Sequence, residues 1–115
     1  MTSRYEVHHP NFFNQYTAIT TVDADTVVVT ALAGNRIFIT DLIVQSNQTA
    51  ALGSWTLTDA ASVTMLGPLE IVDQVLFVAH FKTPLVNQTR NSAVHFDKTA
   101  GEDDWEVYIA GYYAP

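Results

Sequence analysis

Apolar and polar residues follow one another along most of this chain in short runs that are rich in β-branched and aromatic side chains. Within the runs, apolar residues tend to recur at every second position, which is the period of a strand with one buried face. Turn residues separate the runs at near-regular spacing, and no stretch combines a helical period with helix caps. The pattern therefore predicts an all-β protein, an antiparallel β-sandwich with a jelly roll as its expected form.

The expected strands are the runs bounded by Gly, Pro, Asn or Asp. They are Tyr16–Val22, Thr26–Ala31, Arg36–Ser46, Ser54–Thr58, Ser62–Leu66, Leu69–Val72, Val75–Phe81, Ala93–Asp97 and the closing DDWEVYIAGYYAP, with Leu85–Val86 as a short edge piece. Val75–Phe81 is continuously apolar, which is typical of a central strand covered on both faces, with a short buried helix as the alternative. Gly67-Pro68 and Thr83-Pro84 are expected to separate the runs on either side of them.

The longest run changes the face on which its apolar residues lie. Ile37 and Ile39 share one parity, whereas Leu42 and Val44 share the other. Because strand side chains alternate between two faces, a bulge or bend near Thr40-Asp41 is needed to keep both pairs in one core. Long strands that bend in this way commonly belong to both sheets of a sandwich or turn a barrel corner.

Residues 1–15 show no sustained period of either kind, although Tyr5, Phe12 and Phe13 are bulky and apolar in a polar setting. One interpretation is a segment folded back over its own core. The other is an arm that docks on a neighbouring subunit, because aromatic anchors have few side-chain torsions to immobilise on binding. The expected organisation is an N-terminal arm at residues 1–15 and a single β-sandwich domain at residues 16–115.

Composition narrows the classes of partner. A chain of 115 residues with 48% hydrophobic residues fits one folded domain. Twelve acidic against five basic residues give a formal charge of -7, which repels a phosphate backbone, so no nucleic acid is expected as a partner. Only 15% of the residues are charged, below the roughly 25% of an average domain, and the resulting uncharged surface suits contact with other proteins. The first residues lack the apolar run of a signal peptide, and no segment reaches the roughly 18 apolar residues of a membrane span, so no membrane is expected either.

No pattern of residues points to catalysis or to a cofactor, and neither is expected. The five glycines are scattered rather than gathered in a phosphate-binding loop. No serine lies in a nucleophile elbow, and the chain has no cysteine to act instead. Trp55 and Trp105 could stack on a sugar, but both lie on the inward parity of their strands and are expected in the core. The last strand instead presents an aromatic outer face that includes Tyr108.

A metal site is also not expected, although two groups of residues invite the comparison. His80 and His95 could meet across paired strands, as in metalloenzymes of the cupin type, whereas the adjacent His8-His9 would point to opposite faces of a strand. Glu102–Asp104 is a dense acidic run of the kind that can hold calcium. Lone strand histidines are more often packing or surface residues, and acidic runs are more often solvated loops.

Four pieces of the sequence carry a family resemblance. They are the corner Ala33–Ile37, the KTPL at Lys82–Leu85, the NSAVHF at Asn91–Phe96 and the closing VYIAGYY at Val107–Tyr113. With the order of strands over roughly residues 25 to 113, they resemble small β-sandwich structural proteins of tailed bacteriophages, most of all capsid decoration, or cement, proteins. Phage fibre-head domains share the same pattern.

The resemblance implies a non-enzymatic virion protein that is made in the host bacterial cytoplasm and binds the outside of the mature capsid. Its expected partners are the major capsid protein, which it would clamp against internal DNA pressure, and other copies of itself, as a trimer rather than a dimer. The alternatives are a fibre-head or receptor- or carbohydrate-binding module and a cupin-like metalloenzyme. The expected partner contacts lie in the arm and are Arg4, Tyr5, His8, His9, Phe12 and Phe13.

Overall fold

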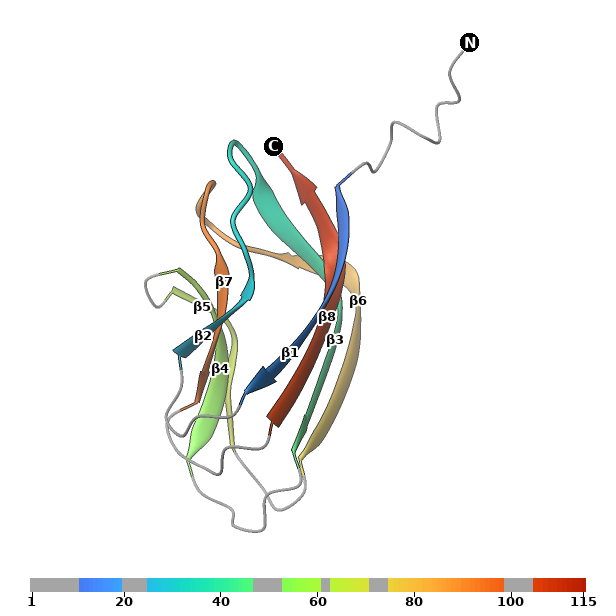
Figure 1. Ribbon diagram of the computed structural model, residues 1–115, viewed down its shortest axis with the longest axis vertical. Coiled ribbons are helices and arrows are strands. Elements are labelled where there is room, and N and C mark those ends of the chain that lie inside the picture. The colour runs from blue at the N-terminus through green and yellow to red at the C-terminus, as the bar shows by residue number, and fades with distance from the viewer. Residues whose placement is uncertain (1–10, 20–24, 47–52, 61–62, 71–74, 99–104) are drawn as a thin grey trace.

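The described part of the chain folds into β-strands and the turns that join them. The computed structural model describes residues 11–19, 25–46, 53–60, 63–70, 75–98 and 105–115. Its strands are β1 (Phe12–Ile19), β2 (Asp25–Val29), β3 (Arg36–Ser46), β4 (Ser54–Asp59), β5 (Val63–Glu70), β6 (Leu76–Val86), β7 (Val94–Lys98) and β8 (Trp105–Ala114). They form two packed layers, so the predicted all-β sandwich is confirmed (Figure 1).

The two layers are four-stranded sheets in which every paired strand is antiparallel to its neighbour. One sheet has the order β1-β8-β3-β6 and the other has the order β2-β7-β4-β5. All successive strands except β4 and β5 therefore lie in different sheets. Connections that cross repeatedly between two sheets are compatible with the jelly roll expected from the sequence.

The core is the layer of side chains between the sheets, and its centre is aromatic. Trp55 of β4 stacks on Phe96 of β7 with 5.3 Å between ring centroids, and Phe96 contacts Trp105 of β8 at 5.7 Å. Both tryptophans are buried, as their parity predicts, so neither offers a surface to a sugar. Rings of this size remove much apolar area from water and hold the sheets together.

The predicted change of face within the longest strand is confirmed. The pairing of β3 with both β6 and β8 shifts register between Ile39 and Asp41. Ile37 and Ile39 are buried on one side of the shift, and Leu42 and Val44 are buried on the other. The irregularity thus turns both apolar pairs toward the same core, although they differ in parity.

Both expected proline breaks are wrong, because these prolines lie inside edge strands. β5 continues through the cis peptide bond Gly67-Pro68, and β6 continues through Pro84 as far as Val86. An edge strand pairs on one side only, so it tolerates a residue without an N–H group. Leu69 and Glu70 are therefore part of β5, and Leu85 and Val86 are part of β6, whereas residues 71 and 72 of the expected run Leu69–Val72 lie outside the described residues.

The expectation of a central strand at Val75–Phe81 is also wrong. β6 is the last strand of its sheet, and Leu76 and Val78 are 69% and 65% exposed on it. The run is continuously apolar because one set of its side chains faces the core while the other set lies on an apolar surface. Composition alone does not distinguish this case from burial on both faces.

β1 begins at Phe12, four positions before the expected first strand. Its residues 12 to 15 thus belong to the sandwich rather than to an arm.

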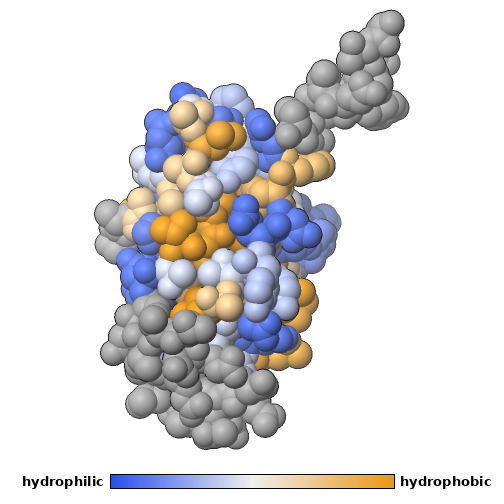
Figure 2. Space-filling view, viewed as in Figure 1, coloured by the Kyte–Doolittle hydropathy of each residue, from blue (hydrophilic) through white to orange (hydrophobic). Residues whose placement is uncertain are grey.

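β1 and β2 are the edge strands on one side of the molecule, which is the side seen in Figure 2. Hydrophobic residues gather there between the two sheets, and further ones follow the margin of the β1-β8-β3-β6 sheet.

Candidate binding face

The outward side chains of the β1-β8-β3-β6 sheet form an ordered surface, which we call the outer face. The strand pairings align these side chains in rows that cross all four strands. From one end of the sheet to the other, the rows are Phe12–Tyr112–Phe38–Val86, Asn14–Ala110–Asp41–His80, Tyr16–Tyr108–Ile43–Val78 and Ala18–Glu106–Gln45–Leu76. Two apolar and aromatic rows therefore enclose one row of small and polar residues.

Large hydrophobic side chains are concentrated on this face. Ten large hydrophobic residues are exposed in the described part of the chain, and most of them belong to the rows above. Those on the outer face are Phe12, Tyr16, Ile43, Leu76, Val78, Val86 and Tyr108. Exposed apolar groups that are scattered singly need no explanation, but a contiguous patch of this kind marks a surface that meets another molecule.

The aromatic rings of the outer face pack on one another across the strands. Tyr112 stacks on Phe38 with 4.9 Å between centroids and 5° between planes, and Phe12 meets Tyr112 edge-on at 6.2 Å. In the other aromatic row, Tyr16 and Tyr108 lie 4.8 Å apart. Such contacts limit the rotation of each ring. The face is thus partly preorganised, which lowers the entropic cost of binding.

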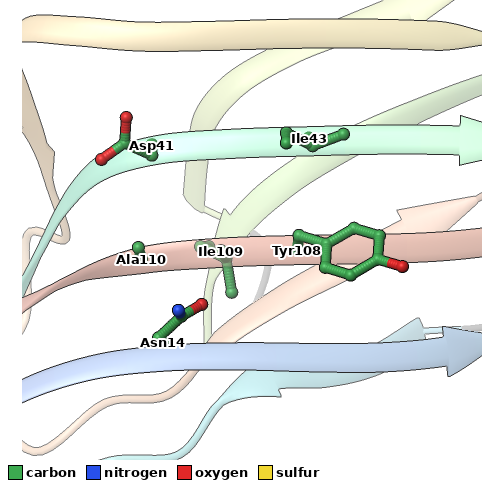
Figure 3. A pocket seen from close by; sticks show the side chains of 6 residues that line it. All are labelled: Asn14, Asp41, Ile43, Tyr108, Ile109 and Ala110. Atoms are coloured by element: carbon green, nitrogen blue, oxygen red, sulfur yellow. The ribbon is translucent and has the colours of Figure 1, made fainter.

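A shallow hollow lies at the centre of the outer face, where the row of small residues meets an aromatic row. Its volume is about 100 Å³, and its lining side chains come from β1, β3 and β8 (Figure 3). Ala110 of β8 lies between Asp41 of β3 and Asn14 of β1, and Tyr108 also lines the hollow. Small-molecule pockets usually measure roughly 300 Å³ or more, so this hollow suits one inserted side chain rather than a whole ligand.

The carboxylate of Glu106 accepts three hydrogen bonds within the outer face. Gln45 donates through Nε2 at 3.0 Å, and the hydroxyl groups of Tyr16 and Tyr108 donate at 3.0 and 3.3 Å. These bonds, first of all the one from Gln45, lower the pKa of Glu106 below its ordinary value. Partial burial and the charge of Glu106 raise the pKa of Tyr108. The network therefore favours the ionised form of the acid and the neutral form of the phenol, and its hydrogen bonds orient both side chains.

Asp41, at the rim of the hollow, is held in a similar way. His80 Nδ1 lies 2.7 Å from Asp41 Oδ1, and the hydroxyl group of Thr40 donates to Oδ2 at 2.8 Å. The bond to His80, followed by the bond from Thr40, lowers the pKa of Asp41 below its ordinary value. Both acids of the outer face are thus engaged by neighbours. The outer face thus combines fixed polar groups with rows of exposed apolar side chains.

The strand histidines do not meet, contrary to the possibility raised by the sequence. His80 lies in β6 of one sheet, whereas His95 lies in β7 of the other sheet and contacts a different aspartate at 3.0 Å. In the described ranges, no three His, Cys, Asp or Glu side chains gather as a metal ion would require. His8, His9 and Glu102–Asp104 lie outside the described residues.

The expected contact residues fall into three groups. Phe12 is 63% exposed at the corner of the outer face. Phe13, one position later, points to the other side of β1, is buried in the core and packs on Tyr113 at 5.2 Å. The remaining expected contacts lie outside the described residues and are Arg4, Tyr5, His8 and His9.

Sequence reasoning missed most of the outer face. Tyr16, Ile43 and Val78 each lie at outward positions of their strands, although all three are large and hydrophobic. Alternation does not indicate this, and it does not indicate that all three join Tyr108 in a single row, because the row depends on strand order and register. None of the described residues forms a helix long and apolar enough to span a membrane. Comparison of the chain with protein-family models, with curated proteins and with solved structures gives no match.

Proposed function

We propose that this chain is a non-enzymatic binding protein whose outer face docks on another protein, and that it decorates and stabilises a tailed-phage capsid. The observation that carries the proposal is the patch of aligned aromatic and aliphatic side chains across four strands of one sheet. Packed aromatic residues on a rigid sheet are the usual anchors of protein interfaces. The resemblance of four sequence pieces to capsid decoration proteins directs this binding to the exterior of the virion.

Two further features favour a protein partner. Both carboxylates of the outer face already accept hydrogen bonds from neighbouring side chains, so less unpaired charge has to be desolvated when a partner covers them. The hollow accepts one projecting side chain, which is how a hot spot commonly engages its partner. The major capsid protein is the proposed partner, with further copies of this chain beside it.

A second candidate is a fibre-head module that binds a receptor or a carbohydrate. The hollow favours it, because the Tyr108 ring, the Asn14 amide and the Asp41 carboxylate combine an aromatic surface with polar groups suited to hydroxyl groups. Buried tryptophans weigh against it, since Trp55 and Trp105 offer no stacking surface. The small volume limits this candidate to the edge of one sugar ring.

The deciding experiment is co-sedimentation of the purified chain with phage shells that have been stripped of accessory proteins, with expanded and unexpanded shells compared. Saturable binding to expanded shells alone is expected for a cement protein. Binding to neither form would refute the capsid proposal, and a glycan array would then test the second candidate.

Variants assign the binding to the outer face. Tyr108→Ala removes a central ring and is expected to weaken binding to expanded shells about 30-fold, which is the effect of a typical hot-spot residue. Val27→Ala is the matched control, because Val27 is similarly exposed but belongs to β2 of the other sheet. Equal binding by both variants would show that another surface makes the contact.

A further inference from the structure

The two open sides of the sandwich differ in how well they are closed. On one side, the edge strands β1 and β2 each contribute two buried residues, which are Phe13, Ile19, Val28 and Val29. On the opposite side lie β5 and β6, which end the order of their sheets and are fully described. None of their residues is buried. The longer pair of edge strands, β5 and β6, is therefore less buried than the pair β1 and β2.

The side chains on this second side are nevertheless those of a core. β6 carries Phe77 and Phe81 on its inward parity, and β5 carries Met65 and Leu69. These residues pack against the central cluster but stay partly exposed, and Phe77 touches the buried ring of Trp55 edge-on at 5.3 Å. Aromatic side chains stabilise a protein most when they are completely removed from water. Because the core side chains on this side remain partly exposed, a further layer of protein packed against them would be stabilising.

We infer that the β5–β6 side is an interface between two copies of this chain, in which β6 pairs with β6 of the second copy about a two-fold axis. Within the described residues, β6 pairs with β3 on one side only, so its other edge carries unpaired backbone N–H and C=O groups. A strand pairs antiparallel with itself under two-fold symmetry. A single two-fold rotation thus covers both the exposed strand edge and the partly buried core residues in each of the two copies.

Charge favours a second copy as the occupant. The chain has a formal charge of -7, but β5 and β6 together contain one acid, Glu70, and one lysine, Lys82, besides His80. The acids are therefore placed mainly elsewhere. Two copies that approach through this side avoid the repulsion that their net charge would otherwise cause.

The size of this side also agrees with a dimer. At about 3.3 Å per residue, β6 spans about 36 Å and β5 about 26 Å, and two sheets about 10 Å apart with their outer side chains are about 20 Å across. The whole side thus measures on the order of 600 Å² in each copy. Pairing over six residues of β6 covers about 20 Å of its length, which is about 400 Å² per copy and about 800 Å² in total, the size of a weak and reversible interface.

The pairing is expected in the first half of β6. Lys82 and Pro84 occupy its second half, and both types of residue protect sheet edges from pairing. The segment Leu76–Phe81 contains neither a lysine nor a proline, and all of its residues except His80 are apolar. Val78, at 65% exposure, lies near the middle of this segment.

The test is sedimentation velocity of the full chain over a wide range of concentrations, with no capsid present, so it is independent of the proposed capsid binding. The wild type is expected to dimerise reversibly. Val78→Lys places a charge twice in the two-fold interface and is expected to raise the dissociation constant about 100-fold or more. Phe12→Lys is the matched control, because Phe12 is equally exposed on the outer face but lies in β1, at the far edge of the sheet. It should dimerise like the wild type.

Circular dichroism should show that both variants are folded, since both positions are exposed. Amide hydrogen exchange gives a second readout: residues 76–81 of the wild type should exchange more slowly as concentration rises, and the edge of β1 should not change. A monomer at all concentrations, a trimer, or a dimer that survives Val78→Lys but dissociates with Phe12→Lys would each overturn the inference.

Discussion

The backbone of β8 lies close against that of β3 at Gly111, and one added methyl group tests this contact. A Cβ atom at this position would lie 1.9 Å from the carbonyl oxygen of Phe38 and 3.0 Å from the Cα atom of Ile39. Both atoms belong to the backbone, so no side-chain rotation relieves the contact. The strands would have to separate locally by about 1 Å, and hydrogen bonds of the ladder would lengthen with them.

The expected cost follows from these contacts. Overpacking a core costs about 1–3 kcal/mol, and a weakened backbone hydrogen bond adds about 1 kcal/mol. Gly111→Ala is therefore expected to lower the free energy of unfolding by about 2–4 kcal/mol. Gly34→Ala is the control: Gly34 has a φ of +79°, and nothing lies within 4 Å of its Cβ position. Its substitution costs only the left-handed backbone strain, about 1–2 kcal/mol.

Urea unfolding provides the assay, because Trp55 and Trp105 are buried and their fluorescence reports on the core. The midpoint should fall for both variants, and the slope should stay that of the wild type if unfolding is two-state. A Gly111→Ala protein that is no less stable than the Gly34→Ala protein would refute the reasoning, since the collision between β8 and β3 would then cost nothing.

Two further predictions concern the polar groups of the outer face. His80→Ala should raise the pKa of Asp41 toward its ordinary value of 3.8, as measured by carboxyl-carbon NMR, because the bond to His80 is the largest lowering contribution. A carboxylate whose pKa is lowered in the folded state stabilises the fold at pH values above its ordinary pKa of 3.8, and this contribution is lost as the pH falls through the folded-state pKa. The free energy by which the wild type is more stable than this variant should therefore shrink in acid. A difference that grows in acid would contradict the assignment. Glu106→Gln should lower the pKa of Tyr108 while partial burial still holds it above the ordinary value of 10.0, and an unchanged tyrosine titration would exclude any influence of the Glu106 charge.

Local alternation determined the fold class and the direction of the core side chains. Ile37 and Leu42 differ in parity, yet both are apolar, so the need for a bulge between them could be read before the structure was known. Trp55 and Trp105 were placed inward by the same argument and are buried. These predictions succeeded because the direction of a strand side chain depends on its immediate neighbours in the chain.

Strand order was decided only by the tertiary structure. The segment that starts at Val75 is as apolar as a central strand, but β6 lies at an edge. Pro84 fits there because no strand among the described residues pairs with that edge. Local composition records how much apolar surface a strand carries and not what covers it. The partly exposed β5–β6 side therefore emerged from the packing of the two sheets.

The outer face shows the same division. The sequence alone determined that Tyr108 points outward, but Tyr16, Ile43 and Val78 joined its row only through pairings among four strands that are distant in the chain. Phe12 and Phe13 look alike in the sequence, and the position of β1 in the sheet made one a surface residue and the other a core residue. Which residues share a surface depends on register and sheet order, which arise from long-range pairing rather than from neighbouring residues.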